Sequence, residues 1–555
     1  MAPVTDRADL LSIAEDWAAQ DPDPQTVGEL RDLIAAVRSG DAESLRELTE
    51  AFNGTLEFGT AGLRGRMGPG SNRMNRVVVM RAAAGLARYL RDTGGTSIVI
   101  GFDARHNSAV FAHDTARIMA AAGIAPMILP RPLPTPVLAF AIRHLGASAG
   151  VMVTASHNPA QDNGYKVYLG DGSQIVPPTD HEIATCIDAV GRVDDIAMSD
   201  DYTTLDDSVL DAYIARAVTL VSDGPREVTF VATALHGVGG EVLRRVVTGA
   251  GFAAPIVVAE QQEPDAAFPT VVFPNPEEAG AMDLALELAR HTRVDLVIAN
   301  DPDADRCAAA IPHDGDWRML TGDEVGWLLG WWTIERQVSR GEQPHGVLAQ
   351  SIVSSDMLRA IATDAGLGYA ATLTGFKWVS RVPGLVFGYE EALGYCVDPS
   401  GVSDKDGITA ALVLLEMTAH LKASGHTLQD VLDEIALKFG VYATGQASVR
   451  VTDVSLIRDA MMRLRGAPPT TLAGRAVTRL DDLEKGVDGL PPTDGLRFVL
   501  DGARVIVRPS GTEPKLKCYL QVVLPFVGDL PTTRAHAAEE LQGLRDAISD
   551  ALALA

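Results

Sequence analysis

Short apolar runs alternate with helical patterns along most of the chain. Up to about residue 50 the apolar residues recur at helical intervals, as Leu30, Leu33 and Ile34 do. From the run TSIVIG at residues 96–101 onward, β-branched segments are followed by helical patterns, the first at residues 112–122. This alternation predicts right-handed βαβ units and a mostly parallel sheet.

The same alternation continues to about residue 440. We expect strands at residues 294–299, 346–350 and 385–387, and helices at residues 356–364 and 408–423. At residues 228–240, VTFVATALHGVGG predicts a strand and a Gly-rich turn, with a helix from Glu241. These glycines do not match the dinucleotide-binding pattern, so they favour close helix–strand packing.

The last part of the chain has a different pattern. Alternation at residues 503–508 and 515–520 predicts antiparallel strands. The length of 555 residues suggests three or four domains. We place a helical lead-in with an α/β domain at 1–205, α/β domains at 206–320 and 321–440, and an α+β domain at 441–555.

Composition narrows the class of protein. A net charge of −26 argues against nucleic acid as the main ligand, so any phosphate site must be a local basic pocket. The four cysteines are scattered without CxxC spacing, which indicates neither a zinc site nor a disulfide framework. The N-terminus has no secretory signal pattern, and no apolar run is long enough to span a membrane. We therefore expect a soluble cytoplasmic protein that acts on small molecules, without nucleic-acid or membrane partners.

Reactive side chains gather at residues 151–168, VMVTASHNPAQDNGYKVY. An apolar run ends in Thr154, Ser156 and His157, and Pro159 prevents the strand from continuing. This places the Ser156 hydroxyl at the carboxyl edge of a sheet, where open α/β sheets bind ligands. A turn at residues 163–164 would bring Lys166 near. Ser156 is thus a candidate nucleophile or phosphate carrier, with a capped turn after a core strand as the alternative.

Three aspartates follow a second buried run. Asp301, Asp303 and Asp305 come directly after VDLVIA at residues 294–299. In an extended segment they point to one side and repel one another unless a cation lies among them. Oxygen ligands of this kind suit Mg²⁺. A calcium loop does not fit, because Arg306 and Pro312 stand where glycine and glutamate are required. The remaining alternative is a solvated acidic turn.

Several loops carry further polar groups. The Gly-rich segment 58–65 contains Arg64, and the segment 508–515 offers two hydroxyls, a glycine and flanking cations that suit a phosphate. Other candidates lie in the segments 374–378, 388–394 and 405–407. Taken alone, each of these three segments is better explained by a helix cap or a surface turn.

Four of these segments occur in the order typical of one family. TASHNP at 154–159, DPDADR at 301–306, YEEA at 389–392 and RPSGT at 508–512 resemble the phosphoserine, metal, sugar and phosphate loops of the α-D-phosphohexomutase superfamily. The resemblance covers nearly the whole chain and is strongest to bacterial α-phosphoglucomutases and phosphopentomutase-type mutases. It implies an α/β fold with a four-domain architecture: three related mixed α/β sandwich domains and a C-terminal α+β lid domain around a central cleft.

The resemblance also implies an activity and a set of site residues. It suggests a phosphoglucomutase that interconverts α-D-glucose 1-phosphate and glucose 6-phosphate through a phosphoserine and a glucose 1,6-bisphosphate intermediate, with one Mg²⁺ ion. The catalytic residues would be Ser156, His157, Lys166, Arg64 and Arg306. The metal ligands would be Ser156, Asp301, Asp303 and Asp305. The substrate-binding residues would be Thr374, Lys377, Glu390, Glu391, Lys405, Arg508, Ser510, Gly511 and Thr512.

One position departs from the family pattern. Many members have serine where this chain has Ala392, which leaves the preferred sugar open. Phosphomannomutase and phosphopentomutase are therefore alternatives with the same mechanism, and a sugar-phosphate-binding protein without activity and a phosphatase are further ones. Either Lys166 or His157 could be the general acid/base. The chain could be a monomer or a homodimer.

Overall fold

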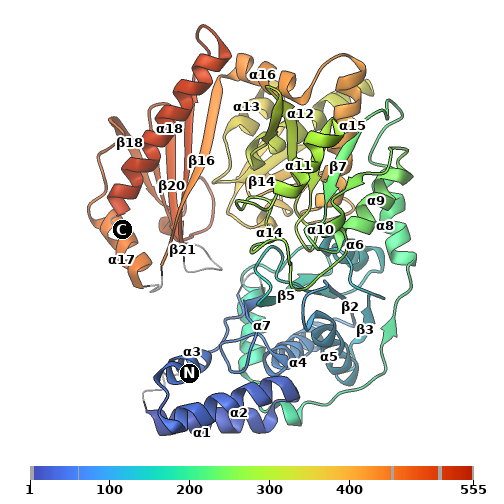
Figure 1. Cartoon of the computed structure of the whole chain (residues 1–555), viewed down its shortest axis with the longest axis vertical. Helices are drawn as coiled ribbons and strands as arrows, with labels where there is room; N and C mark the ends of the chain where they lie inside the picture. Colours follow the sequence, from blue (N-terminus) through green and yellow to red (C-terminus); the bar gives the residue numbers. More distant parts are fainter. Residues whose placement is uncertain (1–5, 60–61, 452–454, 510–514, 553–555) are drawn as a thin grey trace. The chain divides into compact units, whose positions relative to one another are not determined.

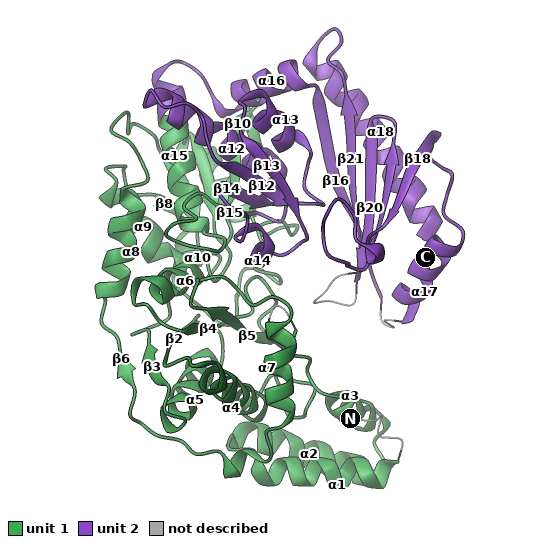
Figure 2. Cartoon of the chain, turned by 180° about the vertical axis from the view of Figure 1, so that it is seen from behind, with its two compact units in different colours: residues 1–319, 394–419 green, residues 320–393, 420–555 purple. Residues whose placement is uncertain are grey.

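The computed structural model describes residues 6–59, 62–451, 455–509 and 515–552, which are drawn in colour in Figure 1. These residues form two compact units. The first unit contains residues up to 319 together with 394–419, and the second contains residues 320–393 and those from 420 onward (Figure 2). Within the described ranges, no helix is both long and apolar enough to cross a membrane.

Three helices begin the first unit: α1 (Arg7–Gln20), α2 (Pro24–Ser39) and α3 (Ala42–Phe52). The side chains of Asp6, Asp23 and Asp41 each cap a helix by accepting a backbone N–H of its first turn. The apolar faces of these three helices form one core with residues of the next helix, including Val77 and Met80. The helical lead-in predicted from the sequence is therefore confirmed.

A six-stranded mixed sheet follows, in the order β1-β5-β4-β2-β3-β6. Its strands are β1 (Leu63–Arg66), β2 (Ser97–Phe102), β3 (Ala125–Ile128), β4 (Ala149–Val153), β5 (Asp162–Leu169) and β6 (Thr203–Thr204). Its helices are α4 (Arg76–Thr93), α5 (Ser108–Ala121), α6 (Thr135–His144) and α7 (Thr179–Asp188), with a 3₁₀ turn at Val193–Asp195. Helices α5 and α6 pack on β2 and β4, so every residue of β4 is buried.

The second sheet of this unit has the order β11-β10-β9-β7-β8. Its strands are β7 (Phe230–Thr233), β8 (Ile256–Val257), β9 (Leu296–Ala299), β10 (Ala308–His313) and β11 (Asp316–Met319). The helices of this part are α8 (Ser208–Val218), α9 (Gly239–Gly249), α10 (Ala259–Gln262) and α11 (Asp283–Thr292). Strand β15 (Gly394–Cys396) belongs to the same unit, and so does most of α15 (Gly407–Ala423).

In the second unit, β12 (Val347–Ser351) lies between β13 (Gly368–Thr372) and β14 (Leu385–Glu390), parallel to both. The accompanying helices are α12 (Gly322–Ser339), α13 (Met357–Asp364), α14 (Phe376–Val379) and α16 (Leu428–Phe439). Helix α12 starts with a capping box, in which Thr321 and Glu324 satisfy each other's backbone N–H groups.

The chain ends in an antiparallel sheet, β16-β21-β20-β19-β18-β17, which we name the C-terminal sheet. Its strands are β16 (Val441–Arg450), β17 (Thr471–Leu472), β18 (Arg475–Asp482), β19 (Leu496–Leu500), β20 (Ala503–Pro509) and β21 (Lys515–Leu524). Helices α17 (Ser455–Gly466) and α18 (Leu530–Leu552) share its core, and a 3₁₀ turn spans Leu483–Lys485. The two antiparallel strands predicted from alternation are confirmed.

The sheets of the first unit are mixed. As the alternation predicts, β2, β3, β4 and β6 pair parallel in the first sheet and β7, β8 and β9 in the second, whereas β1, β5, β10 and β11 pair antiparallel. One expectation about local structure is wrong. Residues 163–164 form no turn but lie inside β5. A Cβ at Gly164 would lie 2.5 Å from the carbonyl oxygen of Thr154, so this glycine permits close strand approach.

A buried carboxylate at the start of α15 generates a test of stability. Asp406 accepts hydrogen bonds from the backbone N–H groups of Ile408 and Thr409 and from the Tyr213 hydroxyl. Burial nevertheless raises the pKa of Asp406 to about 6. The stability that this group contributes is therefore present in acid and lost as the pH rises through about 6.

We expect Asp406→Asn to stabilise the protein at pH 8 by about 1–3 kcal/mol relative to wild type, and much less at pH 5, because the amide keeps the acceptor without the buried charge. Urea unfolding at both pH values measures this difference. The exposed Asp283→Asn serves as control and should show no such pH dependence. An equal effect of Asp406→Asn at both pH values would contradict the explanation.

Candidate active site

The loop after β4 presents the candidate nucleophile. Ser156 is 3% exposed and has φ 53°, a left-handed conformation that is uncommon for a residue with a Cβ. Its Oγ donates to Asp301 Oδ2 at 2.9 Å and lies 3.2 Å from His157 Nδ1. Its backbone N–H donates to Thr154 Oγ1 at 2.9 Å. Strand β4 and this hydrogen bond together fix where the hydroxyl points.

An arginine that sequence reasoning did not assign holds this loop. Arg105 is 4% exposed, and its guanidinium donates to the backbone carbonyls of Ser156, Asn158, Pro159 and Asp162. Asp103 neutralises Arg105 at 3.3 Å. The signal in the sequence was a charged pair directly after the buried run of β2, the strand beside β4. On the other side of the loop, Arg64 Nη1 donates to Asn158 Oδ1 at 3.3 Å.

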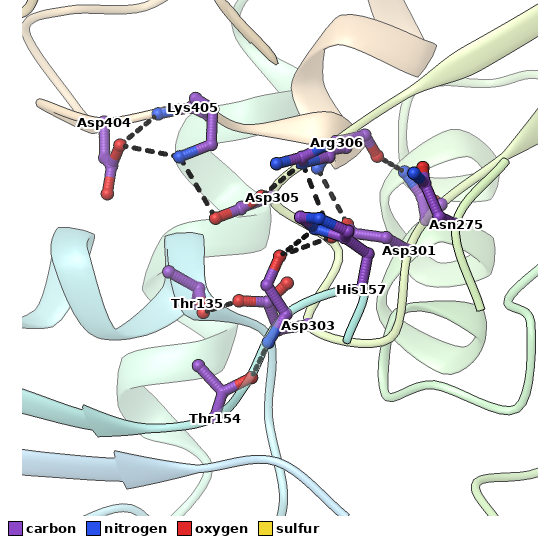
Figure 3. Close-up of polar contacts among 12 residues, drawn as sticks. Thr135, Thr154, His157, Asn275, Asp301, Asp303, Asp305, Arg306, Asp404 and Lys405 are labelled. Atoms are coloured by element: carbon purple, nitrogen blue, oxygen red, sulfur yellow. Dashed lines mark hydrogen bonds and ion pairs between the residues drawn. The ribbon is translucent and has the colours of Figure 1, made fainter. Parts of the chain in front are cut away.

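The three aspartates after β9 converge as predicted, but for a different reason. They lie in a turn and not in an extended segment, since Ala304 has φ 55° and its N–H donates to the Asp301 carbonyl. All three are at most 1% exposed, and one oxygen from each lies within 4.8 Å of the others. Thr135, another residue that the sequence did not indicate, donates from Oγ1 to Asp303 Oδ2 at 2.7 Å (Figure 3).

Three cations surround the carboxylates. Lys166 Nζ lies 2.7 Å from Asp303 and 2.9 Å from Asp305. Lys405 Nζ lies between Asp305, at 3.2 Å, and Asp404, at 3.4 Å (Figure 3). Arg306 Nε is 3.9 Å from carboxylate oxygens of both Asp301 and Asp305. The first unit thus brings together all five residues that we named as catalytic, the triplet and Lys405.

The surrounding charges shift the pKa values of Asp301 and Asp305 in opposite directions. Burial and the repulsion of its two neighbours raise the pKa of Asp301 well above its ordinary value. Burial would also raise the pKa of Asp305, but Lys166, Lys405 and Arg306 outweigh it and hold that pKa below the usual range. Burial lowers the pKa of Lys166, yet Asp303 and Asp305 more than compensate, so its pKa is raised. Lys166 is therefore a charged donor in this arrangement.

The triplet fits a divalent cation. Oδ1 of Asp303 and Oδ1 of Asp305 are buried and have no hydrogen-bond partner. A buried carboxylate oxygen without a partner is unfavourable unless an ion or water binds it. Within the described ranges, this is also the single cluster of His, Cys, Asp or Glu residues with metal-binding geometry. A set of oxygens alone matches Mg²⁺ better than zinc.

The other residues that we named lie in the second unit. Glu390 ends β14, and its Oε1 accepts the backbone N–H of Gly375 at 2.7 Å. Glu391 Oε2 accepts hydrogen bonds from two serine hydroxyls. Lys377 lies in α14, and Thr374 lies in the bend just before that helix. Arg508 lies on β20. Ser510, Gly511 and Thr512 lie outside the described residues.

Comparison with known sequences identifies the family. Four domain patterns of phosphoglucomutase/phosphomannomutase match in order: alpha/beta/alpha domain I at 55–193, domain II at 211–315, domain III at 321–439 and the C-terminal domain at 449–523. The chain belongs to the phosphoglucomutase/phosphomannomutase family. The predicted family and four-domain architecture are confirmed, and the chain is an enzyme of the mutase type, an intramolecular phosphotransferase.

Its relatives carry names that differ in the sugar. A Haemophilus influenzae protein named "Probable phosphomannomutase" is 51% identical over 80% of this chain and 92% of its own length. The human "Phosphopentomutase" is 34% identical over 92% of this chain and 90% of its own. The "Phosphoribomutase" of Saccharomyces cerevisiae is 35% identical over 91% of both. Glucose as substrate is thus not confirmed, and the alternatives named with it are better supported.

Solved structures share the fold. A phosphoglucomutase/phosphomannomutase family protein of Burkholderia thailandensis matches with a TM-score of 0.67 at 20% identity, covering 89% of this chain and 97% of that one. The parafusin of Paramecium matches with a TM-score of 0.67 at 19% identity, covering 89% and 95%. At these identities the likeness speaks for the architecture of the family and not for the substrate.

The fit of the aspartate triplet to a divalent cation can be tested with a matched control variant. We expect Asp303→Asn to weaken Mg²⁺ binding at least about tenfold, since one charged ligand oxygen is replaced by a neutral group. Titration calorimetry with Mg²⁺ measures it. Asp404→Asn is the control: this carboxylate is equally buried and also pairs with a lysine, Lys405, but lies outside the triplet. Equal Mg²⁺ affinity in Asp303→Asn and wild type would remove Asp303 from the metal site.

Proposed function

We propose that the chain is a phosphopentomutase that moves a phosphoryl group between O1 and O5 of a pentose by way of Ser156. In the resting enzyme Ser156 carries the phosphoryl group. Its Oγ–P bond breaks while a bond from phosphorus to O5 of the pentose 1-phosphate forms, which gives a 1,5-bisphosphate. The bisphosphate turns end for end, and its C1 phosphoryl group returns to Ser156. The observation that supports this chemistry is that the buried Ser156 hydroxyl lies 2.9 Å from Asp301, a carboxylate of the candidate metal site.

The residues around Ser156 have distinct roles in this proposal. Arg64 and Arg306 would bind the oxygens of the transferring group, and Lys166 and Lys405 would hold Asp303 and Asp305 in place. Asp301, Asp303, Asp305 and one phosphoserine oxygen would hold Mg²⁺. When bound there, the ion reduces the negative charge on the phosphoryl group.

The geometry favours His157 over Lys166 as the general acid/base. His157 Nδ1 lies 3.2 Å from Ser156 Oγ, within reach of a proton on the reacting oxygen. Lys166 Nζ donates to two carboxylates, and their charge raises its pKa. A lysine held in its charged form can donate a hydrogen bond but is a poor base near neutral pH.

Two observations support a pentose. The pentomutase and ribomutase relatives match this chain over nine-tenths of both lengths or more. In the sugar loop, Ala392 presents a methyl group that cannot bind a ring hydroxyl, and a pentose has fewer ring hydroxyls to satisfy than a hexose. Phosphomannomutase is the second candidate because the Haemophilus influenzae relative of that name is 51% identical.

Loss of the carrier hydroxyl tests the mechanism. We expect Ser156→Ala to lower turnover by at least about 10³-fold, since no phosphoenzyme can form. After incubation with glucose 1,6-bisphosphate, intact mass measurement should find one phosphate on wild type and none on the variant. Turnover near wild type in Ser156→Ala would disprove the assigned carrier.

A panel of substrates tests the sugar. After priming with glucose 1,6-bisphosphate, we expect kcat/KM for ribose 1-phosphate to exceed that for mannose 1-phosphate and glucose 1-phosphate by about tenfold or more. The missing hydroxyl at position 392 accounts for part of this difference, so Ala392→Ser should narrow it by improving the hexoses. A preference for mannose 1-phosphate or glucose 1-phosphate in wild type would replace the pentose in the proposal.

A further inference from the structure

A short turn after β12, residues 354–356, holds the sugar loop of the second unit. Ser354 Oγ donates to Glu391 Oε2 at 2.8 Å and accepts the backbone N–H of Glu391 at 3.1 Å. Ser351, the last residue of β12, donates to the same carboxylate oxygen at 3.0 Å. We name residues 354–356 the Ser354 turn. It fixes both the backbone and the side chain of Glu391.

The opposite side of the same turn is bound by the C-terminal sheet. Arg504 on β20 donates to the carbonyl of Ser354 at 2.6 Å and lies 3.2 Å from Asp356 Oδ2. Gln521 on β21 accepts the backbone N–H of Asp356 at 2.8 Å and donates to its Oδ2 at 3.1 Å. Arg504 and Gln521 are directly opposite each other in the β20–β21 register, so side chains from two adjacent strands bind the Ser354 turn.

Strand β20 also carries the arginine that we assigned to phosphate binding. Arg504 and Arg508 are four residues apart on one strand and therefore lie on the same face. Tyr519 on β21 is opposite Ile506 in the register, and its pKa is raised by burial and by the charges of Glu391 and Glu390, while Arg508 opposes the shift. The sugar-binding and phosphate-binding groups of this unit are thus within electrostatic range of a single side chain.

We propose that Arg504, through the Ser354 turn, is a positioning residue that sets the register between the phosphate-binding strand β20 and the sugar loop. This inference rests on the proposed function. The spacing between Arg508 and the Glu390–Glu391 pair determines how long a sugar phosphate the unit accepts. The polar connection Arg504–Ser354–Glu391 fixes that spacing, because hydrogen bonds, unlike apolar contacts, are directional and short.

The chain offers a matched control. Arg497 on the neighbouring strand β19 has a side chain 11% exposed, against 13% for Arg504, and also pairs with carboxylates. Its partners, Asp481 and Asp488, lie within the C-terminal part of the chain and are not residues of the Ser354 turn. Arg497→Gln therefore removes a comparable ion pair without touching the connection to the sugar loop.

The decisive experiment measures kcat and KM of the primed, full-length enzyme with ribose 1-phosphate and glucose 1-phosphate. For Arg504→Gln we expect KM for ribose 1-phosphate to rise about tenfold or more, the loss from one charge-assisted hydrogen bond, with kcat within about threefold. The preference between the two sugars should shrink by a similar factor. Arg504→Lys should recover part of both effects, and Arg497→Gln should change neither.

Hydrogen exchange separates this inference from the proposed function. The backbone N–H of Glu391 donates to Ser354, so Arg504→Gln should accelerate exchange in residues 388–394, and Arg497→Gln should not. If wild type turns over no sugar phosphate, the proposed function fails while exchange still tests the connection. Normal KM and sugar preference in Arg504→Gln would overturn the positioning role, as would unchanged exchange in residues 388–394.

Discussion

Mutual repulsion among three buried carboxylates is the constraint on which the first unit depends. Two like charges 4 Å apart repel by about 4 kcal/mol at an effective dielectric of 20, and burial makes the ionised forms more costly still. The protein compensates with Lys166, Lys405 and Arg306, while Asp404 shares Lys405 and Arg64 lies within electrostatic range. Glu277 adds a fifth carboxylate, 3.9 Å from Arg306, so the ionised carboxylates outnumber these four cations until a proton or a further cation is taken up.

The charged groups meet because the backbone has been fixed elsewhere. Ser156 and Ala304 adopt left-handed conformations, which residues with a Cβ adopt only when their surroundings enforce them. Arg105 provides that enforcement for the serine loop through the carbonyls of residues 156–162. For the aspartate turn, Gly407 lets the start of α15 approach the Arg306 carbonyl so closely that a Cβ would be only 2.1 Å away. Backbone conformation and close packing therefore fix the positions of the charged groups, and attraction between the charges is not sufficient to explain the arrangement.

The sequence predicted the parts of this arrangement that are local. The strands before Ser156 and Asp301, the helical lead-in and the antiparallel strands around Arg508 all follow from periodicity and turn residues. What it did not predict depends on contacts far apart in the chain. Arg105 acts on a loop more than fifty residues away, and Thr135 reaches Asp303 from the start of α6. The convergence of the aspartates was predicted from an extended segment, whereas a turn achieves it, because single-sequence patterns do not show a left-handed alanine. The proposed limits of the four domains stay a prediction.

Sugar preference poses a problem of magnitude that the loop alone does not solve. Having alanine instead of serine at position 392 removes one neutral hydrogen bond to the sugar. Such a bond is worth about 0.5–1.5 kcal/mol, or roughly a two- to twelvefold difference in affinity. Such a step distinguishes sugars weakly, because a ring hydroxyl left unbound by the loop can still be solvated by water. A stricter choice between a pentose and a hexose requires that the distance between the phosphate-binding and the ring-binding residues match the length of the sugar phosphate. In the second unit the groups proposed for these two tasks are joined by Arg504 and Ser354, and specificity would then be a property of their spacing as much as of any one contact.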